Sequence, residues 1–263
     1  MSFRRVLGIF LIVVGIVSLV HADEILNALK GSCRITASTE GNRFELRLER
    51  GECSADRRDC HEQTVTEPTE AFTGLSLADL GREGSHVDAA LRAEAGTLTC
   101  SGTVHDSSII GEYVFEPNRG FVARMGQLGI SGFTSDKLQA YTLFRIESGW
   151  VESLQKLGIQ GINSNNLIAM KIFKVDPAYV QSMTALGYST PPAEKLIAMR
   201  VHKVDPVEVK QIRAMGYEPT LDQLVEMRIF KITPEFIERM RARGLNDLTI
   251  SKLVKIRIFK LDE

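Results

Sequence analysis

Two hydrophobic patterns follow one another along the chain. Over much of residues 31–116, apolar and polar positions alternate with a period of two, as in Phe44-x-Leu46-x-Leu48. This alternation is typical of short antiparallel strands that bury one face. By the usual strand lengths, about five to seven strands fit into this segment. We therefore expect a small antiparallel β domain over residues 23–116.

From residue 121 onward the sequence repeats itself. A glycine recurs at spacings of 29, 29, 29 and 28 residues, and a leucine follows each glycine by eight or nine positions. The glycines are Gly129, Gly158, Gly187, Gly216 and Gly244, and the leucines are Leu138, Leu167, Leu196, Leu224 and Leu253. A fixed period of this length indicates stacked repeats. Residues 117–263 are therefore predicted to form an α-helical repeat domain of four full repeats with a half-repeat at each end.

Each repeat is expected to hold two helices that meet at a short corner. An N-capping side chain followed by proline opens the second helix of three repeats, at Asp176-Pro177, Asp205-Pro206 and Thr233-Pro234. The recurring glycine then follows that helix, where a left-handed residue commonly ends it. The fold class predicted for the whole chain is α+β, with a β domain followed by an αα-hairpin solenoid.

The N-terminus has the three regions of a secretory signal peptide. Arg4 and Arg5 precede an uncharged, mostly apolar run over residues 6–20, and Ala22 ends a plausible cleavage site. Residues 1–22 are therefore predicted to be a signal peptide, which makes the protein periplasmic or extracellular. The alternative is an uncleaved anchor that holds the protein to the inner membrane through residues 6–22.

Export changes how the cysteines are interpreted. Cys33, Cys53, Cys60 and Cys100 all lie in the β segment, and an even number of cysteines in an oxidising compartment favours two disulfides. Cys53 and Cys60 flank a short polar loop, while Cys33 and Cys100 lie on the apolar faces of predicted strands. Three connectivities remain open. A zinc site is disfavoured, because no C-x-x-C pair is present and Cys60 adjoins His61.

Charge is distributed unevenly along a chain whose formal net charge is −1. Residues 23–123 hold 10 Lys and Arg against 18 Asp and Glu, whereas residues 124–263 hold 20 against 15. The basic residues of the repeats fall into two columns, four and seven positions after each marker leucine. The first column contains Lys171, Arg200, Arg228 and Arg257; the second contains Arg145, Lys174, Lys203, Lys231 and Lys260.

Because positions three apart share a helix face, the two columns are predicted to form one basic stripe along the repeats. An acidic protein, a polyanionic envelope polymer or lipid headgroups would fit such a stripe. Pairing with acids at the corners, favourable placement at helix C-termini and docking against the acidic β domain are the alternatives. A second hypothesis concerns a mostly aromatic pair of columns that His202 and Glu208 interrupt together, and it predicts that these two side chains form a polar pair.

The second helix of the last full repeat, from Thr233-Pro234-Glu235-Phe236-Ile237 to Gly244, carries a family resemblance, as does the stretch from Gly111 to Asn118. Both resemble exported bacterial proteins in which a small β domain precedes two-helix repeats. Similar regions are appended to antirepressor metallopeptidases of the β-lactam-sensor type. The resemblance implies an extracytoplasmic, partner-binding module. The peptidase part does not carry over, since Val65 stands where H-E-x-x-H needs its second histidine after His61.

The function predicted from these features is that of an exported, non-enzymatic interaction or scaffold protein, with no cofactor, metal or catalytic residue assigned. A sensor or regulatory ectodomain is one alternative, and a hydrolase with an unrecognised site in the β domain is another. The hairpin Leu128-Gly129-Ile130-Ser131-Gly132 resembles that of helix-hairpin-helix proteins, which bind nucleic acid through backbone amides. Export makes nucleic acid an unexpected partner. The membrane is expected as a partner only through an uncleaved N-terminal segment.

Overall fold

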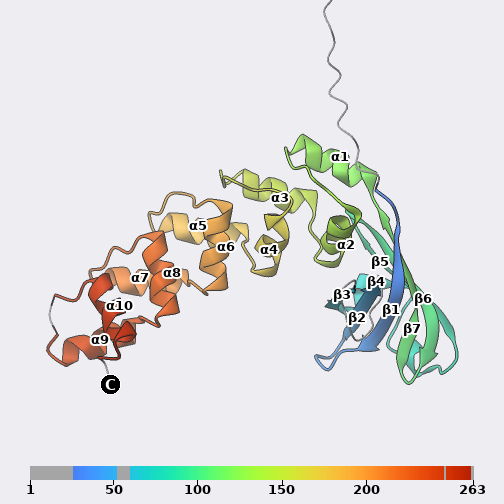
Figure 1. Ribbon diagram of the computed structural model, residues 1–263, viewed down its shortest axis with the longest axis horizontal. Helices are drawn as coiled ribbons and strands as arrows, with labels where there is room; N and C mark the ends of the chain where they lie inside the picture. The colour runs from blue at the N-terminus through green and yellow to red at the C-terminus, as the bar shows by residue number, and fades with distance from the viewer. Residues whose placement is uncertain (1–25, 52–59, 246, 262–263) are drawn as a thin grey trace, which may run out of the picture.

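A computed structural model describes residues 26–51, 60–245 and 247–261 of the chain. Within these ranges, a curled antiparallel sheet of seven strands is followed by ten α-helices, as Figure 1 shows. The α+β class and the predicted range of strand numbers are therefore confirmed. The predicted signal peptide lies outside the described residues. No helix within the described residues has the length and apolar character needed to span a membrane.

The sheet has the strand order β3-β2-β1-β7-β6-β5-β4, and all of its neighbouring strands are antiparallel. Its strands are β1 (Leu29–Ala37), β2 (Arg43–Arg50), β3 (His61–Pro68), β4 (Phe72–Thr73), β5 (His86–Ala93), β6 (Gly96–His105) and β7 (Ser108–Pro117). The predicted alternation is seen directly in β2, where Phe44, Leu46 and Leu48 are buried. The period of two thus places one face of the sheet in the core.

A disulfide joins Cys33 in β1 to Cys100 in β6, although β7 lies between these two strands. Strands separated by one neighbour are about 10 Å apart in a flat sheet, whereas the two Cα atoms here are 6.0 Å apart. The sheet is therefore sharply folded at β7. Cys60 is also disulfide-bonded; Cys53, which also belongs to the predicted set, lies outside the described residues.

Two glycines allow this fold in the sheet. Gly111 of β7 is paired with Gly102 of β6 and with Cys33 of β1. A Cβ atom at Gly111 would lie 2.0 Å from the carbonyl oxygen of Ser101, which is backbone and has no freedom to rotate away. The absence of side chains at both positions lets β6 and β7 approach closely, so that the disulfide can join β6 to β1 across β7.

The helices are nine residues long or slightly shorter. They are α1 (Arg119–Gln127), α2 (Ser135–Leu143), α3 (Ser148–Gln155), α4 (Asn166–Ile172), α5 (Pro177–Ala185), α6 (Ala193–Val201), α7 (Pro206–Ala214), α8 (Leu221–Ile229), α9 (Pro234–Ala242) and α10 (Ile250–Ile258). Asp176, Asp205 and Thr233 cap the helices that begin with proline, as predicted. The recurring glycines all have positive φ, from 75° at Gly129 to 90° at Gly216.

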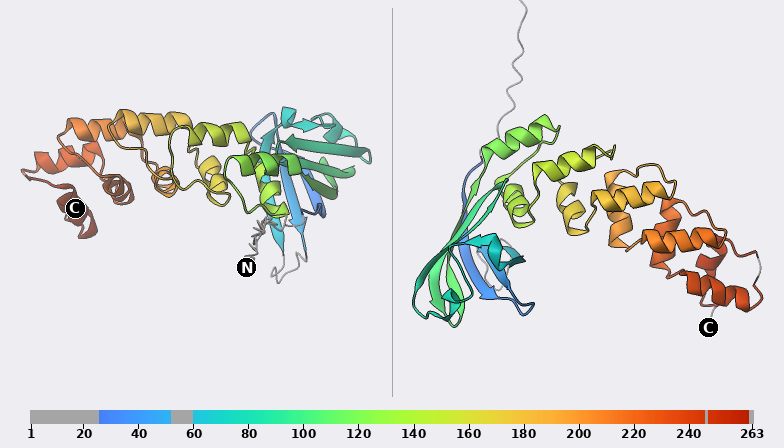
Figure 2. Two further views of the ribbon diagram at one scale, coloured as in Figure 1. Left: turned by 90° about the horizontal axis from the view of Figure 1, so that it is seen from above. Right: turned by 180° about the vertical axis from the view of Figure 1, so that it is seen from behind.

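The even-numbered helices α4, α6, α8 and α10 contact one another in succession, and so do α5, α7 and α9. The resulting rows extend away from the sheet, as Figure 2 shows from above and from behind. At the other end, α2 packs against β5, β6 and β7 and also contacts the opposite end of the sheet, where its Gln139 donates to Gln63 of β3. The curled sheet thus holds α2, and one hydrophobic core continues from the strands into the helices.

Candidate partner-binding site at the helix corners

Side chains of the first basic column contact aromatic rings on the preceding odd-numbered helices. We call Lys171, Arg200, Arg228 and Arg257 the inner cations. Lys171 Nζ lies 4.9 Å from the ring centroid of Trp150, and the guanidinium carbons of Arg200 and Arg257 lie 4.7 and 4.0 Å from the rings of Tyr179 and Phe236. Such contacts contribute about 0.5–2 kcal/mol each, depending on how far the cation is desolvated. These residues therefore help to hold neighbouring helices together.

The arginines among the inner cations also reach back to the end of the preceding even-numbered helix. Arg200 Nε donates to the carbonyl oxygen of Phe173 at 2.9 Å, and Arg228 Nε donates to that of His202 at 3.3 Å. Phe173 and His202 are the C-caps of α4 and α6. The last carbonyl groups of a helix lack partners within the helix, and a cation there interacts favourably with the helix dipole. Arg200 and Arg228 thus serve as C-caps supplied by the next repeat.

Glu208 stands at the position where Trp150, Tyr179 and Phe236 provide the ring beneath an inner cation in the other repeats. Its Oε2 atom forms an ion pair with Arg228, so a carboxylate replaces the aromatic ring beneath the inner cation. Burial raises the pKa of Glu208, and the Arg228 charge opposes that effect. Arg228 donates through Nε to the backbone carbonyl of His202 and through Nη1 to Glu208, and no hydrogen bond joins the side chains of His202 and Glu208 in the described part of the chain. Arg228, rather than His202, is therefore the polar partner of Glu208.

The second basic column lies just beyond the ends of the even-numbered helices, in an unusual backbone conformation. Arg145, Lys174, Lys203, Lys231 and Lys260 have φ values of 50°, 56°, 57°, 54° and 52°. The left-handed region costs a non-glycine residue about 1–2 kcal/mol. At the ends of the odd-numbered helices the chain places glycine in the equivalent conformation. The repeats therefore keep a cation at positions where local backbone sterics favour glycine.

Four of these cations are exposed, and their side chains form no hydrogen bond or ion pair with the residues that the structure describes. We call Lys174, Lys203, Lys231 and Lys260 the corner lysines. All four are exposed, and among the described residues none of their Nζ atoms forms a hydrogen bond or an ion pair. The acids at the corners have another role, since Asp176 and Asp205 accept hydrogen bonds from the amides of Tyr179 and Val207. The corner acids thus cap the next helix.

Exposed aliphatic side chains accompany the corner lysines. Two residues before each of them lie the corner aliphatics, which are Ile172, Val201, Ile229 and Ile258, with exposed fractions of 47%, 42%, 51% and 51%. Exposed apolar side chains that gather on one surface mark an interaction site more often than scattered ones do. Each of these corners thus carries an exposed aliphatic side chain two residues before an exposed lysine, and we call this set the corner surface.

The structure divides the predicted basic stripe into these two groups. The rule that residues three apart share a face applies within a helix, but α4, α6, α8 and α10 end before the corner lysines. The left-handed residue turns the chain at that point. The period of the repeats therefore identifies the two columns. It does not predict the change in backbone conformation between them. A lysine in the sequence does not indicate a left-handed backbone as strongly as a glycine does.

Other clusters on the sheet have less suitable geometry. Ser101 Oγ lies 3.2 Å from His86 Nε2 but donates its proton to Asp88 at 2.5 Å. Asp88 contacts the same nitrogen of His86, at 3.3 Å, whereas a hydrolytic triad needs the carboxylate on the opposite nitrogen. His86 and Asp88 are exposed, and Ser101 is partly buried. Within the described ranges, no group of three or more His, Cys, Asp or Glu side chains is placed to hold a metal ion.

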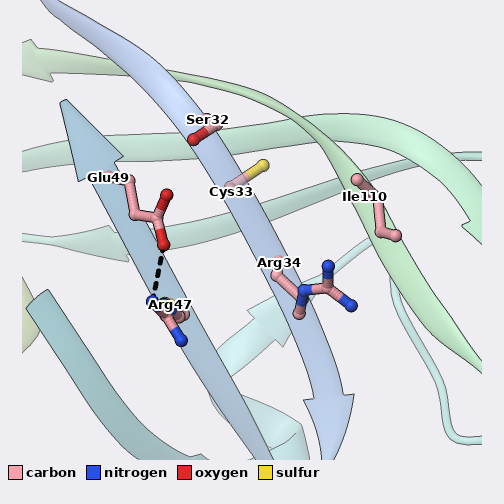
Figure 3. A pocket seen from close by; sticks show the side chains of 6 residues that line it. All are labelled: Ser32, Cys33, Arg34, Arg47, Glu49 and Ile110. Carbon is pink, nitrogen blue, oxygen red and sulfur yellow. Dashed lines mark ion pairs between the residues drawn. The ribbon is translucent and has the colours of Figure 1, made fainter. Parts of the chain in front are cut away.

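A shallow depression of about 290 Å³ lies over β1 and β2, and Figure 3 shows the side chains that line it. Arg34 lies opposite Arg47 in the strand register, which suggests an anion site. Arg47, however, already pairs with Glu49 at 2.8 Å and with Glu62 at 3.3 Å. The corner surface, whose lysines have no ion-pair partner within the described ranges, is therefore the stronger candidate.

No protein-family model, curated protein or solved structure matches this chain.

Proposed function

We propose that this protein is an exported, non-enzymatic interaction protein that binds its partner through the corner surface of its helices. The observation that carries the proposal is the set of corner lysines, which are exposed, have no side-chain partner in the described part of the chain and share one backbone conformation. A protein or an anionic component of the bacterial envelope is the partner class that their charge favours.

The helices, in this proposal, form an αα-hairpin solenoid of about 29-residue repeats. The successive contacts among the even-numbered helices support it, as do the recurring caps and inner cations. In a solenoid each repeat contacts only its neighbours, so equivalent side chains recur along one extended surface. Repetition of the corner surface at each step gives a long partner several equivalent contacts.

Export is the second part of the proposal. The Cys33–Cys100 disulfide supports it, because disulfides persist in oxidising compartments such as the periplasm. The sequence pattern of residues 1–22 supports it as well, with the anchor over residues 6–22 as its alternative. The resemblance to regions appended to β-lactam-sensor-type antirepressors agrees with an extracytoplasmic module that contacts a partner.

The test is capture of a partner from envelope extract by three proteins. They are the unchanged protein, a corner variant with Lys174, Lys203 and Lys231 changed to Gln, and a control variant with Lys30, Lys210 and Lys255 changed to Gln. Both variants lose three exposed lysines, so their net charges are equal. We expect one component to be retained by the unchanged protein and the control variant, lost by the corner variant and released by salt. Equal recovery by all three proteins would contradict the proposed function.

A further inference from the structure

The first corner of the helical part is covered by other parts of the chain, unlike the later corners. Leu143 and Arg145 are the equivalents of the corner aliphatics and the corner lysines in α2 and just beyond it. The sheet covers α2, and Leu143 is only 1% exposed. Arg145 Nε lies 3.4 Å from Oε2 of Glu67 in β3, and the Glu67 side chain is largely buried.

The occupant of the first corner is thus an apolar sheet surface with a carboxylate at its edge. Two further contacts join the sheet segment to the helices around this corner. Arg50 of β2 forms an ion pair with Asp136 of α2, and Glu94, which follows β5, accepts a hydrogen bond at 2.7 Å from the amide of Ser148. Glu94 thereby caps α3, whose N-cap residue Glu147 forms no side-chain cap bond. The sheet segment therefore supplies the carboxylates of Glu67 and Glu94 to the first corner. At the later corners the equivalent aliphatic side chains are exposed, and among the described residues the equivalent lysines form no ion pair.

We infer that the second, third and fourth corners bind a protein segment in which apolar side chains alternate with carboxylates. This inference rests on the proposed function and names the partner's chemistry. Ile172, Val201 and Ile229 would be covered as Leu143 is, and the lysines two residues further on would pair with carboxylates as Arg145 does. Charge favours this occupant, since acids are in excess in the chain's own sheet segment and bases in its helical segment. An anionic membrane also offers apolar and negatively charged groups, but the first corner shows a strand carboxylate in this role.

The experiment measures binding of three probes by fluorescence anisotropy or flotation. The first probe is a labelled random copolymer of glutamate and tyrosine, the second is polyglutamate, and the third is a vesicle of 70% phosphatidylcholine and 30% phosphatidylglycerol. The full chain is compared with the corner and control variants defined above and with a variant in which Ile172, Val201 and Ile229 become Ser. These aliphatics are exposed, so the serine changes leave the core intact.

We expect the full chain and the control variant to bind the glutamate–tyrosine copolymer more tightly than polyglutamate. The corner variant should bind the copolymer about tenfold more weakly, because exposed ion pairs contribute modestly and three are lost. The serine variant should bind both polymers equally. Vesicle binding that only the corner variant loses, without copolymer binding, overturns the inferred protein partner and leaves the proposed function standing. Equal behaviour of the corner and control variants with every probe overturns both.

Discussion

Replacing Cys33 and Cys100 together by alanine is expected to lower the free energy of unfolding by about 4 kcal/mol. The disulfide closes a loop with a sequence separation of 67 residues, and a loop of that length restricts the unfolded chain strongly. The bond also joins β1 to β6 across β7, so its loss releases the fold in the sheet where the two glycines lie. Urea unfolding followed by circular dichroism measures the change.

The control for this prediction is reduction of the unchanged protein. Dithiothreitol also reduces the disulfide that contains Cys60, so reduction should destabilise the unchanged protein by at least as much as the double substitution does. A double variant that unfolds at the same urea concentration as the oxidised protein would show that the bond does not constrain the sheet.

The change Gly111→Ala is expected to lower the free energy of unfolding by about 3 kcal/mol or more. The new methyl group would lie 2.0 Å from the carbonyl oxygen of Ser101 and 2.5 Å from the Cα of Gly102. Both are backbone atoms in paired strands, so relief requires β6 and β7 to separate. Overpacking of this kind costs about 1–3 kcal/mol in side-chain cores and more where backbone must move. Thermal unfolding gives the comparison.

Gly126→Ala is the matched control, because it adds the same methyl group where nothing lies within 4 Å. Gly126 is inside α1, and alanine is the better helix former there by up to ~1 kcal/mol. The two substitutions should therefore move the unfolding temperature in opposite directions. Destabilisation of equal size by both would mean that the close approach of β6 and β7 has no special cost.

Local rules account for much of what the sequence predicted. The period-two alternation around Phe44 identified a strand with one buried face, and the Asp-Pro pairs identified helix starts, since each depends on neighbouring residues alone. The glycines after the odd-numbered helices were equally clear, because only glycine adopts positive φ without strain. The positions of both basic columns followed from the period.

The remaining features depend on contacts between distant segments. Nothing near Gly111 in the sequence indicates that it faces Gly102 and that the sheet folds there. The pairing of Arg145 with Glu67 joins residues 78 positions apart, so occupation of the first corner by the sheet was one of several open alternatives. The left-handed lysines escaped prediction for a local reason, since lysine occurs in so many conformations that its identity says little about its φ value.

The two basic columns have different roles, and one comparison of unfolding free energies tests this difference. The inner variant changes Lys171, Arg200 and Arg257 to Ala, and should lose about 3 kcal/mol with its ring and carbonyl contacts. A glycine variant changes the corner lysines Lys174, Lys203 and Lys231 to Gly. It should stay within ~1 kcal/mol of the unchanged protein, because relief of left-handed strain offsets the lost dipole interaction and the entropy of glycine. Equal losses of stability in the two variants, or a larger loss in the glycine variant, would show that the corner lysines serve the fold and not a partner.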